Sequence, residues 1–341
     1  MASLNLKGPL TVGIDVTNRC NLKCKHCYAN SSFDSKIPDI TLKKFLEVLE
    51  ELNGLGTYVI SLAGGEPLLR SDLCEMTKAI AEKNMLLFLN SNGQLLTLEY
   101  ARRLKKNGVN HIEISIDGLE KNHDTIRGKG TFKKAVAGFE NAQKAGLSVG
   151  IMTVICKQNL NDAEKLIDLF YKKKAIGIGF IRFKPVGRGE EVRDWELSPL
   201  ERKKLIESVY KKKVFYDRKN FNVKIETPLS ILAAQNYPEF LKEHSYINKT
   251  IRGCPGGMVS MHINADGTVT SCSQMPLTVG SIYKSKIKDL WNNSELFLKL
   301  RSRKYKGKCA KCRSLDICGG CRTAAYLASG DVMGEDPGCW L

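Results

Sequence analysis

The chain has 341 residues, of which 43% are hydrophobic, so it can bury a sizeable core without disulfides, which excludes a mini-protein and a disordered tail. No apolar run approaches the roughly 18 to 20 residues of a membrane span, and the start lacks the apolar stretch of a secretory signal, so we expect a cytoplasmic protein. The formal net charge is +17, and the lysines lie in amphipathic stretches without regular aromatic interleaving, which favours an acidic protein partner over nucleic acid.

Short runs rich in β-branched residues alternate with longer segments of helical periodicity. The runs predict six strands, at 11–16, 57–63, 85–91, 109–116, 147–155 and 176–183. Five helical segments lie between them, with predicted N-caps at Thr41, Ser71 and Thr97 and predicted C-caps at Gly108 and Gly146. This alternation predicts an α/β fold with parallel strands joined by right-handed crossovers.

The alternation stops near residue 198, so the chain divides into three predicted parts. Residues 1–197 form a partial (β/α)6 TIM-like barrel, residues 198–252 a helical linker, and residues 253–341 a cysteine-rich second domain. In the last part, Asp266 and Gly267 predict the turn of a hairpin. In the barrel, we expect functional residues in the loops that follow the strands.

Ten of the twelve cysteines gather towards the two ends of the chain, and a cytoplasmic chain has no oxidising compartment in which to pair them, so they point to metal binding or catalysis. Cys20, Cys24 and Cys27 form the pattern CxxxCxxC after the first predicted strand. Three thiolates, where a closed site needs four, suit an iron–sulfur cubane with one open iron. A zinc site completed by His26 or by a distant residue is the alternative.

The same segment resembles the signature of the radical SAM superfamily, CxxxCxΦC, with His26 in the position of the large residue Φ. The resemblance extends over the predicted barrel. It implies that Cys20, Cys24 and Cys27 hold a [4Fe-4S] cluster whose open iron chelates S-adenosylmethionine. One electron from that cluster would cleave the sulfonium and give a 5′-deoxyadenosyl radical, which abstracts a hydrogen atom from the substrate.

The resemblance also assigns S-adenosylmethionine contacts to the loops after the other strands. These contacts fall on His26, Gly64, Gly65, Glu66, Pro67, Ser91, Asn92, Ser115, Asp117 and Arg182. The GGEP element after the second strand would meet the methionyl ammonium through its backbone and Glu66, and the end of the fourth strand would meet the ribose. His26 would lie against the adenine, and Arg182 would reach the carboxylate. For Asp117, a helix or turn cap is the alternative.

Seven cysteines in the tail resemble the SPASM domain, which holds two auxiliary [4Fe-4S] clusters. The resemblance implies an outer cluster on Cys309, Cys312, Cys318 and Cys339 and an inner cluster on Cys254, Cys272 and Cys321. The inner set lacks a fourth cysteine, so it is either open to substrate or closed by a residue such as His262. Only two residues separate Cys318 from Cys321, where the family has three, which leaves the partition of ligands open; a zinc ribbon is the alternative.

An acidic group, Asp331, Glu335 and Asp336, precedes Cys339, and we expect it in a solvated loop. The segment that ends the chain most resembles the cofactor-maturing branches of the SPASM-bearing enzymes. The resemblance therefore implies a radical SAM maturase that modifies a cofactor precursor, either a tetrapyrrole as in haem biosynthesis or the tungsten-pterin cofactor of an oxidoreductase, with an acidic electron donor such as ferredoxin or flavodoxin. One alternative is a maturase that crosslinks or oxidises a peptide or protein. The other is a zinc or iron–sulfur module that binds nucleic acid.

Overall fold

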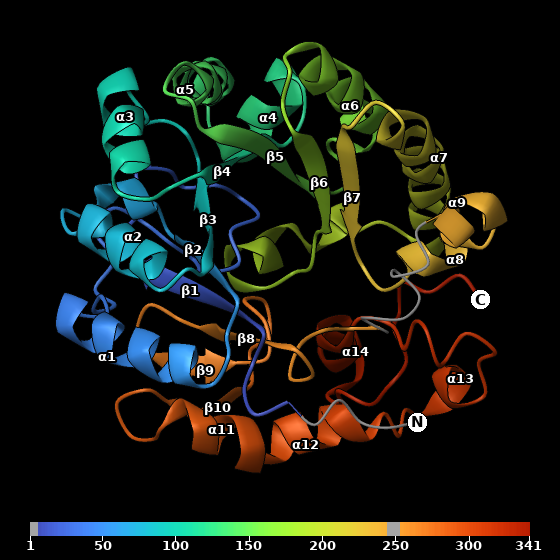
Figure 1. The fold of residues 1–341 in the computed structure, drawn as a ribbon. Coiled ribbons are helices and arrows are strands. Elements are labelled where there is room, and N and C mark those ends of the chain that lie inside the picture. Colours follow the sequence, from blue (N-terminus) through green and yellow to red (C-terminus); the bar gives the residue numbers. More distant parts are fainter. Residues whose placement is uncertain (1–5, 244–252) are drawn as a thin grey trace.

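The computed structural model describes residues 6–243 and 253–341, which form one curved sheet covered by helices (Figure 1). Within these residues the sheet has ten strands in the order β10-β9-β8-β1-β2-β3-β4-β5-β6-β7. The first seven strands in chain order pair in parallel, namely β1 (Thr11–Thr17), β2 (Val59–Gly64), β3 (Leu86–Ser91), β4 (His111–Ser115), β5 (Ser148–Ile155), β6 (Gly177–Arg182) and β7 (Asn222–Glu226). The predicted α/β fold with parallel strands is confirmed.

Helices cover the outer face of the sheet, while its edge strands β7 and β10 have no mutual pairing among the described residues, so the barrel is partial (Figure 1). The helices of this part are α1 (Leu42–Gly54), α2 (Leu73–Glu82), α3 (Leu98–Lys106), α4 (Glu120–Arg127), α5 (Thr131–Lys144), α6 (Ala163–Lys172) and α7 (Pro199–Asp217), with short 3₁₀ segments η1 (Pro67–Leu69), η2 (Leu160–Asp162) and η3 (Gly187–Trp195). Two short helices, α8 (Ser230–Ala234) and α9 (Pro238–Glu243), follow β7.

All six predicted strands are present, but the parallel series has a seventh member that the sequence reading missed. The strand β7 lies inside 198–252, which we expected to be helical, and it pairs in parallel with β6. Only Val223 in this strand is fully buried, because β7 stands at the edge of the sheet. One buried residue among polar neighbours gives a weak strand signal.

The predicted helix caps are confirmed at two of three N-termini. The side chains of Thr41 and Thr97 accept hydrogen bonds from the backbone of Lys44 and Tyr100. Ser71 is not a cap, since α2 begins after Asp72, whose carboxylate instead pairs with the guanidinium of Arg70. The predicted C-cap glycines Gly108 and Gly146 follow α3 and α5 with φ values of +89° and +78°, a conformation that glycine adopts without strain.

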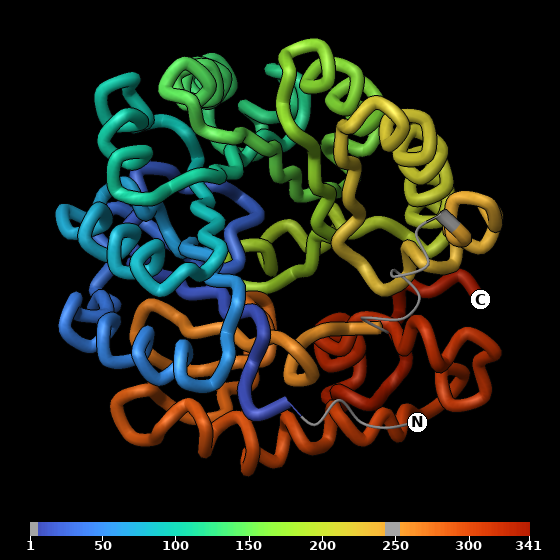
Figure 2. Tube along the Cα trace, viewed as in Figure 1, coloured from blue at the N-terminus to red at the C-terminus, as the bar shows by residue number. Residues whose placement is uncertain are grey.

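The C-terminal region continues the same sheet. The chain returns to the first strand, where β8 (Ser260–Ile263) pairs in parallel with β1 (Figure 2). The predicted hairpin is confirmed: β8 pairs antiparallel with β9 (Thr268–Thr270), and Gly267 lies in the turn with φ +79°. Then come β10 (Thr278–Ser281), α11 (Ile287–Asn293), α12 (Glu295–Ser302), α13 (Gly307–Ala310) and α14 (Arg322–Ser329). None of the described helices is long and apolar enough to span a bilayer.

Candidate active site

The cysteine loop after β1 is held against the loop after β2. The backbone N–H groups of Gly65 and Glu66 donate to the carbonyls of Thr17 (2.7 Å) and Arg19 (2.8 Å). A Cβ atom on Gly65 would lie only 2.1 Å from the Arg19 oxygen, so this position requires glycine. The two glycines of the GGEP element therefore allow two loops to pack, and the expected contact of this element with a methionyl ammonium stays a prediction.

The three thiols of the loop lie near one another in a largely buried environment. Burial, with smaller contributions from Glu66 and the two neighbouring thiolates, raises the pKa of Cys20 to about 12. Burial likewise raises the pKa of Cys24 to about 11, while Cys27 is partly exposed. Three grouped sulfur donors fit an iron–sulfur cluster, since iron–sulfur clusters take thiolate ligands.

Arg188 braces this loop from the far side of the barrel, a role that sequence analysis missed. Its Nε atom donates to the carbonyl of Cys24 (2.8 Å), and its terminal nitrogens donate to Asn30 Oδ1 (2.9 Å) and to the carbonyl of Ser31 (3.0 Å). Its backbone N–H donates to the carbonyl of Cys27 (3.0 Å). One buried arginine thereby holds the second half of the CxxxCxxC segment and the residues that follow it.

Asp117 is fully buried at the end of β4 and organises the residues around the cysteines. Its carboxylate contacts His26 Nε2 (2.6 Å) and Arg127 Nε (2.5 Å) and accepts the backbone N–H of Val154 (2.7 Å). Although burial favours the neutral acid, Arg127 and His26 hold the pKa of Asp117 well below its usual range. Asp117 therefore positions the side chains of His26 and Arg127. The expected contacts of Asp117 with the ribose and of His26 with the adenine stay predictions.

Arg127, at the end of α4, is a second residue that sequence analysis missed. Burial alone would lower the pKa of its guanidinium, but the charges of Asp117, Cys24 and Cys20 raise it. In return, this cation offsets part of the rise that burial causes in the pKa of Cys24 and of Glu66. Arg127 thus places a positive charge where the three thiolates and the loops after β2 and β3 meet.

Glu66 ties the loops after β2 and β3 together. Its buried carboxylate accepts hydrogen bonds from Ser91 Oγ (2.8 Å), from the Asn92 backbone (2.8 Å) and from the Leu68 backbone (3.1 Å), and burial raises its pKa to about 7. The Asn92 side chain donates in turn to Asn21 Oδ1 (2.8 Å) in the cysteine loop. The structure thus brings Glu66, Ser91 and Asn92 together, and Ser115 ends β4 in a half-buried position.

The tail cysteines fall into two groups. Four of them line one pocket, namely Cys309, Cys312, Cys318 and Cys339. Burial, with the neighbouring Cys339 and Cys309 among the smaller causes, raises the pKa of Cys318 to about 12. In the second group, burial and the charges of Cys321 and Cys272 raise the pKa of Cys254 to about 12. The grouping matches the expected outer and inner sets, whose role as cluster ligands we take up as a proposal.

His262 lies on β8, with Nε2 3.2 Å from Asp15 Oδ2 on β1. It thus packs against the first strand, and closure of the inner set by this residue stays untested. Among the described residues, no three His, Cys, Asp or Glu side chains converge closely enough to hold a single metal ion. A cubane instead takes one thiolate on each ligated iron.

Arg182, expected at the S-adenosylmethionine carboxylate, lies in a buried ion-pair cluster with the tail. Its Nη1 atom donates to both carboxylate oxygens of Asp336 (2.7 and 3.0 Å), and its Nη2 atom to Glu196 (3.1 Å). Asp336 also accepts the backbone N–H of Cys321 (2.8 Å). The expectation of a solvated loop is therefore wrong for Asp336, which has no exposed surface, because the ion pair with Arg182 draws it inward.

The other two acids of that group behave differently from Asp336. Asp331 is half-buried and pairs with Lys306 (2.6 Å) and Lys299 (3.2 Å). Glu335 is exposed and accepts the backbone N–H of Lys308. Nothing in the printed sequence separates the buried acid from its two neighbours, since its partner Arg182 lies on a strand 154 residues away.

Comparison with known proteins identifies both regions. Residues 14–170 match the radical SAM superfamily, and residues 254–313 match the SPASM iron–sulfur cluster-binding domain. The AdoMet-dependent heme synthase of Methanosarcina barkeri is 31% identical over 97% of this chain and 96% of its own. The mycofactocin maturase MftC of Mycolicibacterium smegmatis is 27% identical over 98% of this chain and 83% of its own.

A solved structure agrees on the fold. SuiB of Streptococcus suis, bound to its precursor peptide SuiA, superposes with a TM-score of 0.80 over 98% of this chain and 76% of SuiB, at 22% identity. The arrangement of the sheet and its helices is thus a known fold. The chain belongs to the radical SAM superfamily and carries a SPASM domain, which makes it an iron–sulfur enzyme.

Proposed function

We propose that this enzyme is a maturase that modifies a carboxylate-bearing tetrapyrrole precursor of a haem-type cofactor. The observation that carries the proposal is the 31% identity to an AdoMet-dependent heme synthase over nearly the whole length of both chains. A peptide substrate is the second candidate, because the chain also resembles MftC and SuiB, and SuiB is seen bound to its precursor peptide. The tungsten-pterin cofactor has no such support among these relatives.

Within this proposal, each group of cysteines has a separate role. Cys20, Cys24 and Cys27 would hold the cluster that, when bound, supplies one electron to cleave S-adenosylmethionine to the 5′-deoxyadenosyl radical. The outer set, Cys309, Cys312, Cys318 and Cys339, and the inner set, Cys254, Cys272 and Cys321, would hold one auxiliary [4Fe-4S] cluster each. Two observations support this division: the outer four cysteines line one pocket, and the charges of Cys321 and Cys272 act on Cys254.

The surrounding side chains would shape the site without reacting. Asp117 fixes His26 and Arg127, Arg188 fixes the cysteine loop, and Glu66 fixes the loop after β3. The side chains of these residues are each about nine-tenths buried or more, so water has little access to the groups around the three thiols. Exclusion of water would protect a radical from quenching.

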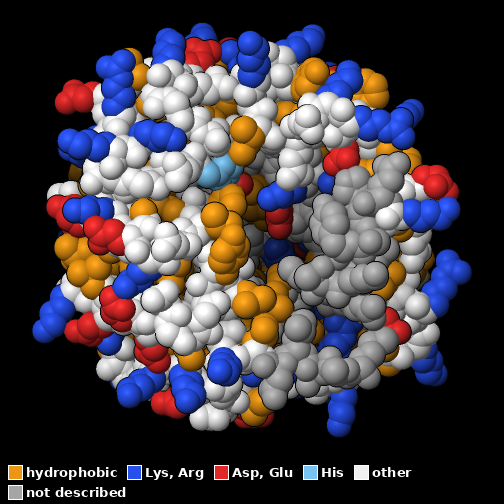
Figure 3. All heavy atoms as spheres, viewed as in Figure 1, with side chains coloured by type: hydrophobic (Ala, Val, Ile, Leu, Met, Phe, Trp, Pro, Cys, Tyr) orange, Lys and Arg blue, Asp and Glu red, His pale blue; other side chains and the backbone are white. Residues whose placement is uncertain are grey.

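An acidic ferredoxin or flavodoxin would deliver the electron, in the cytoplasm. Lysine and arginine exceed aspartate and glutamate, 53 against 36, and basic side chains stand around the face shown in Figure 3, with acidic ones among them. A surface of this charge attracts an acidic donor. All twelve cysteines are free thiols, which fits a reducing compartment.

The test begins with anaerobic reconstitution. We expect about twelve irons per chain, from three cubanes, and reductive cleavage of S-adenosylmethionine to 5′-deoxyadenosine. The holoenzyme is then given dithionite, S-adenosylmethionine and iron coproporphyrin III, and the porphyrin is followed by mass spectrometry. Loss of carbon dioxide from the porphyrin supports the proposal. Cleavage of S-adenosylmethionine with an unchanged porphyrin would overturn the tetrapyrrole assignment.

A further inference from the structure

Basic residues are concentrated around the outer cysteine set of the tail. Eight of the fifteen residues from 299 to 313 are Lys or Arg and none is Asp or Glu, whereas 53 of the 341 residues of the whole chain are basic. This basic segment runs from the end of α12 through α13, in the lower part of Figure 1, and carries Cys309 and Cys312. Six of its eight basic side chains are exposed, namely Lys299, Lys304, Lys306, Lys308, Lys311 and Arg313.

Little of this charge is neutralised within the fold. Lys299 and Lys306 share a single acid, Asp331 (3.2 and 2.6 Å). Exposed like charges that lie close together repel one another, and an acidic surface placed over them would relieve that repulsion. Three further side chains of the segment have no ion-pair partner in the described part of the chain, namely Lys304, Lys311 and Arg313.

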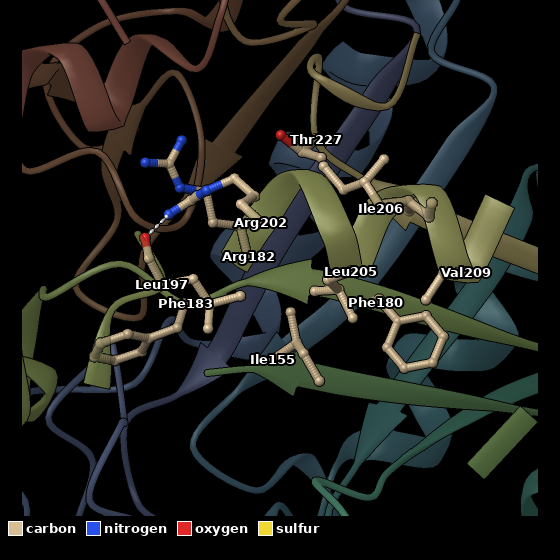
Figure 4. Close-up of a pocket in the computed structure, with 11 residues that line it drawn as sticks. Ile155, Phe180, Arg182, Phe183, Leu197, Arg202, Leu205, Ile206, Val209 and Thr227 are labelled. Atoms are coloured by element: carbon tan, nitrogen blue, oxygen red, sulfur yellow. Dashed lines mark hydrogen bonds between the residues drawn. The ribbon is translucent and has the colours of Figure 1, made fainter. Parts of the chain in front are cut away.

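A buried basic pair near the tail thiols differs from this segment. Arg182 and Arg202 stand together at one end of the narrow space between β5, β6, β7 and α7 (Figure 4). Asp336 and Glu196 face them, and the tail backbone at Gly338 packs on both guanidinium groups. This pair therefore holds the tail to the barrel, and the positive charge that a partner can reach lies in the exposed segment.

The surface beside the first cysteine loop is mixed in charge. Lys23 and Lys25 are exposed within the cysteine motif itself. The charge of Lys23 acts on the exposed Asp34, and Arg19 pairs with Asp39 (3.2 Å). Acids of the same loop thus neutralise part of its basic charge, so an acidic protein would be attracted more strongly to the tail.

The basic segment lies over thiols that come close to the surface. Cys312 and Cys339 are partly exposed, and they line the same pocket as the buried Cys309 and Cys318. The Nζ atom of Lys308 donates to the carbonyl of Cys339 (3.3 Å), so a basic side chain of the segment directly touches this set. A protein docked on the segment would therefore bring its redox group next to the outer thiols.

The three thiol groups follow one another from the tail to the barrel. Cys318 of the outer set and Cys321 of the inner set are three positions apart in the chain. The charges of Cys272, in the inner set, and of Cys27 both act on the half-buried Tyr28, which thus lies between the inner set and the first cysteine loop. An electron donor at the tail surface would stand at the outer end of this series.

We propose that the basic segment 299–313 is the docking surface for an acidic electron-transfer protein of the flavodoxin type. The inference rests on the proposed function and adds to it the place where the electron donor binds. Surfaces of opposite charge speed the encounter and orient the partner, and salt weakens the attraction because ions screen exposed charges. One electron is transferred: the anionic flavin hydroquinone of the donor becomes the neutral semiquinone, and the sulfonium of S-adenosylmethionine is reduced and cleaved.

The test uses the reconstituted holoenzyme, with reduced flavodoxin as the donor and 5′-deoxyadenosine as the product that is measured. The double variant Lys304→Glu/Lys311→Glu should raise the KM for flavodoxin roughly 10-fold at low salt, and the rise should shrink at high salt. Lys134→Glu/Lys211→Glu is the matched control, because it makes the same change in net charge at two exposed lysines of α5 and α7, and its KM should stay at the wild-type value. Dithionite needs no docking surface, so cleavage driven by it reports whether each variant keeps its clusters.

A second measurement needs no variant, so it decides the question even where Lys304→Glu/Lys311→Glu loses iron. The wild-type holoenzyme is acetylated with and without flavodoxin, and the modified lysines are identified by mass spectrometry. Flavodoxin should protect Lys304, Lys308 and Lys311 several-fold more than Lys134 and Lys211.

The outcomes separate this inference from the proposed function. An equal KM in the two double variants, or protection of Lys23 and Lys25 in place of the tail lysines, would overturn the docking surface and leave the donor standing. Protection of the tail lysines by a single-stranded oligonucleotide and not by flavodoxin would overturn it in favour of nucleic acid. Cleavage with dithionite but none with flavodoxin would overturn both the surface and the donor. The tetrapyrrole assignment is independent of all these outcomes, since no porphyrin enters the assay.

Discussion

The two cysteine regions of this enzyme are built in opposite ways. The first three thiols come from eight consecutive residues, and the loops after β2 and β3 with Arg188 hold that segment in place. The seven tail thiols come from segments between Cys254 and Cys339 that only the folded chain brings together. The first group of thiols is thus brought together by a local sequence motif, whereas the second is brought together by the tertiary structure.

Replacing Cys24 tests most directly whether the first cysteine region is the reactive centre. Cys24→Ala removes one of three thiolates from a group without a fourth cysteine nearby, so we expect no 5′-deoxyadenosine after anaerobic reconstitution and an iron content near eight instead of twelve. Chromatography of the nucleoside and a colorimetric iron assay measure both. The control is Cys74→Ala, a half-buried thiol in α2 outside both regions. Cleavage that survives in Cys24→Ala would show that the eight-residue motif is not the reactive centre.

The corresponding change in the tail is Cys318→Ala. It removes one thiol from the pocket lined by four cysteines, so we expect a loss of about four irons but a much smaller fall in S-adenosylmethionine cleavage than in Cys24→Ala. The same two assays apply. Ser314→Ala, which lines the same pocket without a thiol, should keep its iron. Loss of S-adenosylmethionine cleavage equal to that of Cys24→Ala would mean that the two regions are not independent.

This contrast also explains what the sequence could predict. Local signals were sufficient for the six strands, the caps at Thr41 and Thr97, and the cysteine loop, because each depends on neighbouring residues. The strand β7 was missed because an edge strand buries little. The role of Arg188 was missed because its partners lie 157 to 164 residues away in the chain. The role of Arg127 was missed although Asp117 is only ten residues away, because a buried arginine looks like a surface one in sequence.

Replacing Asp336 tests how much a tertiary contact of the tail contributes to stability. Asp336→Asn leaves the buried Arg182 with Glu196 as its remaining charged partner, which should destabilise the fold by up to roughly 3 to 5 kcal/mol. The measurement is the apparent melting temperature of the holoenzyme with its iron content. Asp331→Asn is the matched control, since its lysine partners are largely exposed and the pair contributes about 1 kcal/mol at most. An equal fall in melting temperature for the two substitutions would contradict a stabilising role of the buried Asp336–Arg182 ion pair.

The smallest expected effect on stability comes from Thr97, whose contribution depends on neighbouring residues alone. Its side chain accepts the backbone N–H of Tyr100 (3.1 Å) and caps α3, so Thr97→Ala should cost about 1 kcal/mol of stability while iron content and cleavage stay at wild-type levels. Ser71→Ala is the control, because Ser71 is exposed and Asp72 takes the cap position of α2. Two threonine and serine positions with the same sequence signal should therefore differ in the apparent melting temperature. A larger loss at Ser71 than at Thr97 would show that the cap geometry at these two helices is the reverse of the one described. Because α3 packs on α2 and α5 in the described part of the chain, any loss of iron in Thr97→Ala would reveal that the barrel wall and the cysteine loop unfold together.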